Sequence, residues 1–288
     1  MQEKLLAALA EAASERSEGG RTYGCLSLEA VSSLASRFNL PISELSALAL
    51  ENGFLPLRYV KNIGTIGLDG QAKLLRSAAV VVGVGGIGGN AAEMLARLGF
   101  GKLTLIDPDT FDETNLNRQN FSCRDVVGMA KVEVVRDRIL EISGGADVAT
   151  YRVAAESDNL PRLIDGADVV IDALDSLSDR HVLQRACAEM GVVMVHGAIA
   201  GTALQVTTIY PGDPGLVSFA PLPESEEHKV RGIELETGNP PTTPALAAAI
   251  QVIEAVKMIT GIGTTLRGKM LYMDVLDWTL DFIDLSEG

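Results

Sequence analysis

A glycine-rich turn constrains the fold of this chain more than any other feature: residues 80–90 read VVVGVGGIGGN. The β-branched run before the first glycine is typical of a buried strand, and residues 89–98 have the composition of a helix. A strand, a tight glycine turn and a helix bring backbone N–H groups close to a phosphate. The segment therefore predicts a nucleotide-binding unit, in which the ligand approaches Gly83, Gly85, Gly86 and Gly88.

An acidic residue at the end of the next apolar run extends this interpretation. Asp107 lies 19 residues after Gly88 and closes the run 103–107. In dinucleotide-binding units, a carboxylate at this place binds a ribose hydroxyl. NAD-dependent oxidoreductases and enzymes that use ATP share these features, so they predict a nucleotide without naming it.

Composition limits the class of protein. The chain has 288 residues, 47% of them hydrophobic and 22% charged, which is enough for a large buried core. We find no apolar run as long as a membrane span, and the acidic N-terminus lacks the basic start of a secretory signal. The formal net charge of −14 argues against a nucleic-acid partner. We therefore expect a cytoplasmic protein that binds neither membrane nor nucleic acid.

The three cysteines, Cys25, Cys123 and Cys187, stand far apart, without a CxxC pair or a Cys/His cluster. This spacing predicts no structural zinc. Cys187 fits a small core residue of a helix. Cys123, in a predicted loop before Arg124, is the better candidate for a reactive thiol, but no histidine is near it in sequence. We expect it to pack rather than to react.

The hydrophobic pattern divides the chain into three parts. Residues 1–52 are predicted to form an N-terminal helical extension, with helices at 2–17, 28–38 and 42–52. Residues 53–75 form an N-terminal arm, and residues 76–288 form the main domain.

In the main domain, predicted strands alternate with predicted helices. Strands are expected at 79–82, 103–107, 148–153, 169–172 and 192–196, and helices at 89–98, 129–142, 159–164 and 177–190. This alternation favours an α/β fold with a Rossmann-like, mostly parallel sheet that has helices on both faces. After Gly201 the pattern changes to a strand at 204–210, a long loop at 211–241, a helix at 243–260 and strands at 270–275 and 279–283. The last strands are expected to extend the sheet in antiparallel fashion.

Polar residues follow several of the predicted parallel strands: Asp107, Asp109, Asn115, Asn117, Arg118, Gln119, Lys131, Asp172 and Asp175. Each one has an ordinary alternative. The aspartates could be turn residues, Arg118 and Lys131 could be solvated, and Asp175 with Ser176 could simply cap a helix. Ligands of open α/β sheets, however, bind at the carboxyl ends of the strands. The sequence thus predicts one binding site at that edge of the sheet.

These motifs together resemble the adenylating enzymes of the ubiquitin-activating superfamily, in particular the ThiF/MoeB/HesA family. The resemblance covers about residues 56–285. It rests on the glycine turn, on Asp107 with Asp109, on Asn115-Leu-Asn-Arg-Gln119, on Gly128-Met-Ala-Lys131, and on Asp175 followed by Arg180. The runs at 197–201 and 205–207 also fit.

The resemblance implies an ATP-dependent reaction, in which the C-terminal glycine of a small sulfur-carrier protein (ThiS/MoaD-like) becomes an acyl-adenylate and pyrophosphate leaves. A carboxylate is already ionised at neutral pH, so catalysis needs positioning and positive charge. By resemblance, Arg118 and Lys131 supply that charge. Asp175 would hold Mg²⁺. Asp107 would bind the ribose, with Asp109, Asn115, Gln119 and Ser176 beside the nucleotide.

The resemblance also implies partners. The substrate would be a small β-grasp carrier ending in Gly-Gly, and the protein would be a homodimer in which each arm reaches the other site. Lys61 stands where relatives carry an arm arginine, and the nearby Arg58 could compensate. The crossover loop 211–241 contains no cysteine, so a thioester step on it is not predicted, and its acidic run 224–227 suits a cover over the carrier tail.

Two other functions fit part of the sequence. A nicotinamide-dependent oxidoreductase accounts for the glycine turn and Asp107, but it gives no role to Arg118, Lys131 or Asp175. A non-catalytic homologue that binds ATP and a carrier is suggested by the lysine at position 61.

Overall fold

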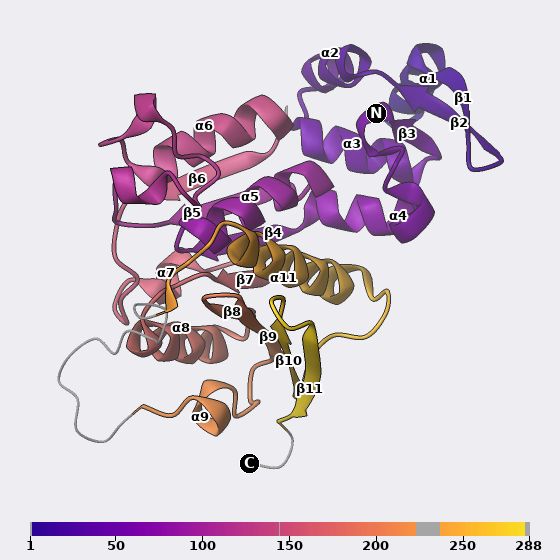
Figure 1. Ribbon diagram of the computed structural model, residues 1–288. Helices are drawn as coiled ribbons and strands as arrows, with labels where there is room; N and C mark the ends of the chain where they lie inside the picture. The colour runs from indigo at the N-terminus through magenta and orange to yellow at the C-terminus, as the bar shows by residue number, and fades with distance from the viewer. Residues whose placement is uncertain (1, 144, 223–236, 286–288) are drawn as a thin grey trace.

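An eight-stranded sheet forms the centre of the protein in a computed structural model that describes residues 2–143, 145–222 and 237–285 (Figure 1). The strand order is β11-β10-β9-β8-β7-β4-β5-β6. Five neighbouring strands are parallel: β4 (Ala78–Val82), β5 (Lys102–Ile106), β6 (Asp147–Tyr151), β7 (Val169–Asp172) and β8 (Val193–Ala200). Three antiparallel strands complete the sheet: β9 (Ala203–Ile209), β10 (Lys269–Asp274) and β11 (Thr279–Asp284). The predicted fold class is confirmed.

Helices cover both faces of this sheet (Figure 1). On one face, side chains of Ala79 and Val81 pack with those from α4 (Ile63–Arg76), α5 (Gly86–Leu98), α6 (Lys131–Ser143) and α11 (Thr242–Thr260). On the other face, Val80 and Val82 pack with α7 (Leu160–Leu163), α8 (Leu177–Met190) and α9 (Leu216–Phe219). Because both faces are buried, the central strands are continuous runs of valine and isoleucine rather than alternating ones.

The direction in which the chain winds reverses beside β4. From β4 it proceeds through β5 to β6, then crosses to β7 on the other side of β4. Such a reversal opens a crevice at the carboxyl ends of the strands. The glycine turn, which follows β4, lies at this crevice.

The N-terminal residues form a module with its own core, and here one prediction is wrong. The helix expected at 2–17 is shorter, because α1 covers only Gln2–Ala12. The residues after it form β1 (Ser14–Glu18), which pairs with β2 (Arg21–Leu26). Gly19 and Gly20 both have positive φ and form the hairpin turn. The module also contains α2 (Leu28–Phe38) and α3 (Ile42–Glu51). The arm begins with β3 (Phe54–Pro56), which pairs parallel with β2. The extension is therefore helical only in part.

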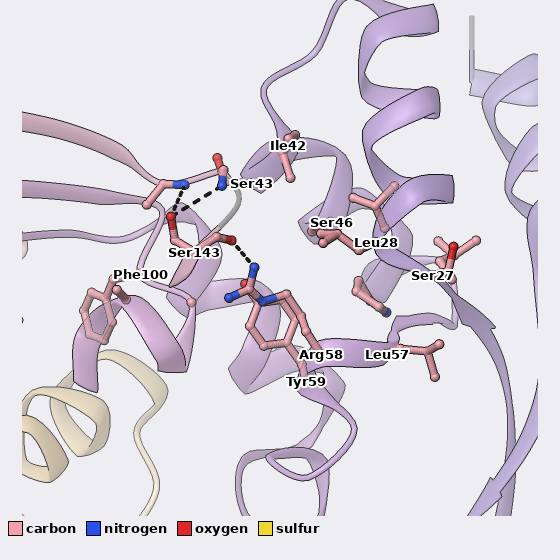
Figure 2. Close-up of a pocket in the computed structure, with 17 residues that line it drawn as sticks. Ser27, Leu28, Ile42, Ser43, Ser46, Leu57, Arg58, Tyr59, Phe100 and Ser143 are labelled. Carbon is pink, nitrogen blue, oxygen red and sulfur yellow. Dashed lines mark hydrogen bonds between the residues drawn. The ribbon is translucent and has the colours of Figure 1, made fainter. Parts of the chain in front are cut away.

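The arm holds the module against the main domain. It contains β3, the short helix η1 (Leu57–Tyr59) and α4. Arg58 of η1 donates hydrogen bonds to the backbone carbonyls of Ile142 and Ser143, in the last turn of α6. Figure 2 shows the bond to Ser143. Cations at a helix C-terminus stabilise its carbonyl end. Next to this contact lies a small, mainly apolar cavity of about 100 Å³ between module and main domain.

One described helix is long and apolar enough, by length and composition alone, to cross a membrane. It is α11, and half of its most apolar window is buried. The helix packs against α5, β8 and β9, so its apolar residues are accounted for in large part by the core.

Candidate functional site

A polar pocket of about 470 Å³ opens at the carboxyl ends of β4, β5 and β7. This volume is in the range of small-molecule binding sites. Most of the residues predicted for the site line it: Gly83, Gly85, Gly86, Asp107, Asp109, Asn115, Arg118, Gln119, Lys131, Asp175 and Ser176. The crossover of the chain therefore brings together residues that are up to 93 positions apart, from Gly83 to Ser176.

Backbone packing explains why two positions of the turn are glycine. A Cβ on Gly88 would lie 1.8 Å from the carbonyl oxygen of Gly83, and one on Gly83 would lie 2.6 Å from the carbonyl oxygen of Ala173. Gly83 also has φ of 85°, which side chains other than glycine rarely adopt. Gly88 thus lies behind the pocket and keeps the start of α5 close to β4 and β7.

Asp107 is buried at the end of β5. Its carboxylate accepts hydrogen bonds from the backbone N–H of Val84 at 2.7 Å and of Asp109 at 2.8 Å. Burial raises the pKa of Asp107, while Lys131 opposes this rise. The carboxylate therefore fixes the glycine turn and still borders the pocket.

Lys131, the first residue of α6, points into the pocket from a buried position. Its Nζ lies 3.0 Å from Oδ2 of Asp109, and its backbone N–H donates to the carbonyl of Asp109. The start of a helix is the positive end of its dipole, so an ammonium there is unfavourable unless an ion pair or a ligand offsets its charge. Lys131 thus offers a fixed positive charge to the pocket.

The loop after β5 supplies amide and guanidinium groups. Asn115 closes a capping box with Asp112 at the short helix η2 (Glu113–Asn115). Arg118 is half-buried and donates to the carbonyl of Thr114 and to Oδ1 of Asn117. Gln119 is buried, and its Oε1 has no hydrogen-bond partner among the described residues. A buried amide without a partner in the wall of a pocket fits a ligand that completes its hydrogen bonds.

Asp175 and Ser176 lie at the start of α8. Ser176 caps the helix by accepting the N–H of Asp179, and Asp175 is exposed in the pocket. Capping is thus the role of the serine, while the carboxylate of Asp175 stays open to the pocket. Mg²⁺ takes one or two protein carboxylates together with phosphate oxygens, so this donor set fits the ion. The described residues contain no group of three His, Cys, Asp or Glu placed to hold a metal.

Lys61 is not among the described residues that line the pocket of its own chain. Its Nζ lies 2.5 Å from Oε1 of Glu18 in β1. Arg58, the alternative, is bound to the end of α6. Any role of Lys61 in a nucleotide site would therefore have to be played in another copy of the chain.

Two further residues line the pocket that were not predicted as site residues. Asn239, from the crossover loop, accepts a hydrogen bond from Asn117 at 3.2 Å through its carbonyl, and its buried Oδ1 has no partner among the described residues. Arg180 lines the pocket from α8. Behind it, the buried Asp172 binds the buried His196. Nothing in the local sequence of His196 indicates this pairing, because β7 and β8 become neighbours only in the folded sheet.

Comparison with proteins of known sequence shows the family to which the chain is similar. Residues 59–287 match the model of the ThiF family. The SAMP-activating enzyme E1 of Haloferax volcanii is 33% identical over 228 residues, 78% of this chain and 84% of that protein. The molybdopterin-synthase adenylyltransferase of Haemophilus influenzae is 31% identical over 220 residues, 76% of this chain and 90% of that protein. The chain spans about half the length of relatives such as adenylyltransferase and sulfurtransferase MOCS3 of Aedes aegypti.

Solved structures with a similar fold are also known. E. coli MccB with MccA-N7isoASN has a TM-score of 0.70 and 19% identity, with 100% of this chain and 88% of that one covered. E. coli TcdA, a tRNA N6-threonylcarbamoyladenosine dehydratase, has a TM-score of 0.59 and 28% identity over 71% of this chain and 94% of that one. The first likeness concerns the fold alone. With the family match over most of its length and the curated relatives above, the chain belongs to the ThiF family.

Proposed function

We propose that this protein adenylates the C-terminal carboxylate of a small ubiquitin-like or sulfur-carrier protein with ATP and Mg²⁺. A carboxylate oxygen attacks the α-phosphorus of ATP, the bond from that phosphorus to the β-bridging oxygen breaks, and pyrophosphate leaves with the electron pair. The products are an acyl-adenylate and pyrophosphate. No proton has to be removed from the nucleophile, because the carboxylate is ionised at neutral pH.

The observation that carries this proposal is the meeting of Lys131, Arg118 and Asp175 in one pocket beneath the glycine turn. Two cations suit the charge of a triphosphate and of a leaving pyrophosphate. Mg²⁺ held by Asp175 would neutralise further phosphate charge. A nicotinamide-dependent oxidoreductase needs no such cluster, which is why we place it second among nucleotide enzymes.

The other pocket residues support positions for the nucleotide. Asp107 and Asp109 suit the ribose hydroxyls, since they lie after β5 as such carboxylates do. Gly83, Gly85 and Gly86 line the pocket, where phosphates can approach their backbone N–H groups. Asn115, Gln119 and Ser176 supply amide and hydroxyl groups at the same pocket.

The proposal is tested by ATP–pyrophosphate exchange with a carrier protein that ends in Gly-Gly. We expect exchange that needs both Mg²⁺ and the carrier, and that falls about 100- to 1000-fold when Arg118 or Asp175 is changed to Ala. Nucleotide binding without any exchange, across a panel of carriers, would support the non-catalytic homologue instead.

Assembly and location belong to the same proposal. We infer a homodimer in the cytoplasm, in which Lys61 of one copy approaches the nucleotide of the other. The position of Lys61 away from its own pocket supports this arrangement. A division into residues 1–52, 53–75 and 76–288 also stays a prediction, and the run 224–227 lies outside the described residues.

A further inference from the structure

A buried carboxylate–imidazole pair lies directly behind the pocket wall. His196 of β8 has its Nδ1 2.7 Å from Oδ2 of Asp172, the last residue of β7, and the exposed fractions of their side chains are 1% and 0%. Replacing a buried pair of this kind with apolar residues is often neutral or stabilising. Stability alone therefore gives no reason for two such residues at this place.

The backbone N–H and the backbone carbonyl of Leu174 both form hydrogen bonds with this cluster. The second oxygen of Asp172 accepts the backbone N–H of Leu174 at 3.1 Å. The guanidinium of Arg180 donates to the carbonyl of Leu174, and its Nε lies 4.0 Å from Oδ2 of Asp172. The residue that follows Leu174 is Asp175. The turn that presents Asp175 to the pocket is thus fixed at the preceding peptide.

The chemistry of the pair indicates its protonation state. Burial lowers the pKa of His196, and Asp172 opposes that effect by its hydrogen bond and charge. Arg180 and His181 on α8 act on the pKa of His196 in the same direction as burial. A neutral imidazole with its proton on Nδ1 satisfies all of this, because it donates to an ionised Asp172 and adds no second buried charge. The Nε2 atom then has no partner among the described residues.

We propose that His196 is a positioning residue for Asp175. Its Nδ1–H donates a hydrogen bond to one oxygen of Asp172, and the other oxygen accepts the N–H of Leu174. The resulting turn carries the Asp175 carboxylate at the place where Mg²⁺ and the phosphates are expected. This inference rests on the proposed function for the role of Asp175, but the hold on the Leu174 peptide can be measured without nucleotide.

The test compares His196→Leu with His196→Asn. Leucine removes the donor, whereas the asparagine amide places an N–H near the position of Nδ1. Cys187→Ala is the matched control, because Cys187 is a buried free thiol on α8 beside the same cluster and is not one of the groups that bind the Leu174 backbone. Each protein is studied by amide hydrogen exchange of residues 172–176 and by Mg²⁺ titration of ATP–pyrophosphate exchange.

We expect His196→Leu to lose protection at the Leu174 amide. It should also need at least about tenfold more Mg²⁺ for half-maximal exchange, because loss of a residue that supports a metal ligand typically weakens metal binding by this amount. His196→Asn should keep both properties close to wild type. Cys187→Ala should lower the melting temperature without changing either property.

Two results separate the inference from the proposed function. Unchanged protection of the Leu174 amide in His196→Leu, with only a lower melting temperature, would overturn the positioning role. Lost protection in His196→Leu that asparagine restores, in a wild-type protein that shows no pyrophosphate exchange, would uphold the positioning role and reject the proposed adenylation.

Discussion

Lys131 and Asp109 form an ion pair in which the lysine is buried and the aspartate is exposed. Their atoms are 3.0 Å apart, and the side chains are 8% and 63% exposed. The ammonium is thus fixed at the wall of the pocket by a partner that faces solvent. A phosphate that enters the pocket would meet a cation that already has its position, which lowers the cost of ordering it.

We expect Lys131→Ala to lower kcat/KM for ATP by about 100- to 1000-fold, since it removes a preorganised charge. Asp109→Asn keeps an oxygen that can accept from Nζ, so the loss should be smaller. Steady-state exchange at varied ATP concentration checks both variants. An equal loss in the two would show that the Asp109 carboxylate matters as much as the Lys131 ammonium and would contradict this prediction.

The glycine turn gives a prediction about stability. Gly88→Ala would force a Cβ to within 1.8 Å of the Gly83 carbonyl oxygen, and we expect it to reduce the free energy of unfolding by about 3 kcal/mol. Gly85→Ala is the matched control, because its Cβ would first meet Nε2 of Gln119 at 3.4 Å. Urea unfolding measures both. Equal stability of the two variants would contradict the packing argument.

The regular core was predictable from the sequence because its signals are local. The valine run of β4, the glycines after it and the alternation of strands and helices each depend on neighbouring residues. The hairpin of β1 and β2 was not predictable in this way. Ser14 to Glu18 has no apolar alternation, and it forms a strand because β2 pairs with it and with β3.

Only the locally signalled part of the candidate site was predictable as well. Asp107 and Lys131 could be placed at the sheet edge from their position after strands. The ion pair of Lys131 with Asp109 and the hold of Asp172 on Leu174 depend on side-chain directions that no sequence pattern reports. Boundaries were also imprecise, since β8 continues to Ala200 beyond the predicted end at His196.

The proposed dimer gives a complementation prediction. Lys61→Ala and Asp175→Ala should each be nearly inactive alone. If Lys61 acts in the other copy, mixing the two variants after unfolding and refolding should restore about a quarter of the sites, since one site of each mixed dimer is intact. No recovery in a mixture shown to contain mixed dimers would exclude a role of Lys61 across the interface.

The thiols give a prediction about chemistry. Burial, with a smaller contribution from Asp172, raises the pKa of Cys187 to about 12, and burial also raises the pKa of Cys25. Cys123 is exposed. Iodoacetamide should therefore modify Cys123 first, as mass spectrometry can show, and a variant with all three cysteines replaced should still form the adenylate. A thiol-cleavable conjugate with the carrier that is lost in Cys123→Ser would contradict this prediction.

The buried pair gives a prediction about pH. The pKa of His196 is lowered in the folded state from an ordinary value of 6.5, so the unfolded chain binds the proton more readily. The free energy of unfolding should therefore fall as the pH drops below about 6.5. His196→Asn should have a weaker dependence in chemical unfolding between about pH 5 and 8. An identical slope in both proteins would mean that His196 does not contribute.

The bond of Arg58 to the end of α6 affects how this protein can be divided. One helix has Lys131 at its start, in the pocket, and the carbonyls of Ile142 and Ser143 at its end, on the arm. A shortened protein that begins at Tyr59, where the family match begins, would contain every proposed nucleotide-binding residue and lack the anchor of that helix. Loss of activity in such a fragment would then report a displacement of Lys131 as well as any missing substrate contact.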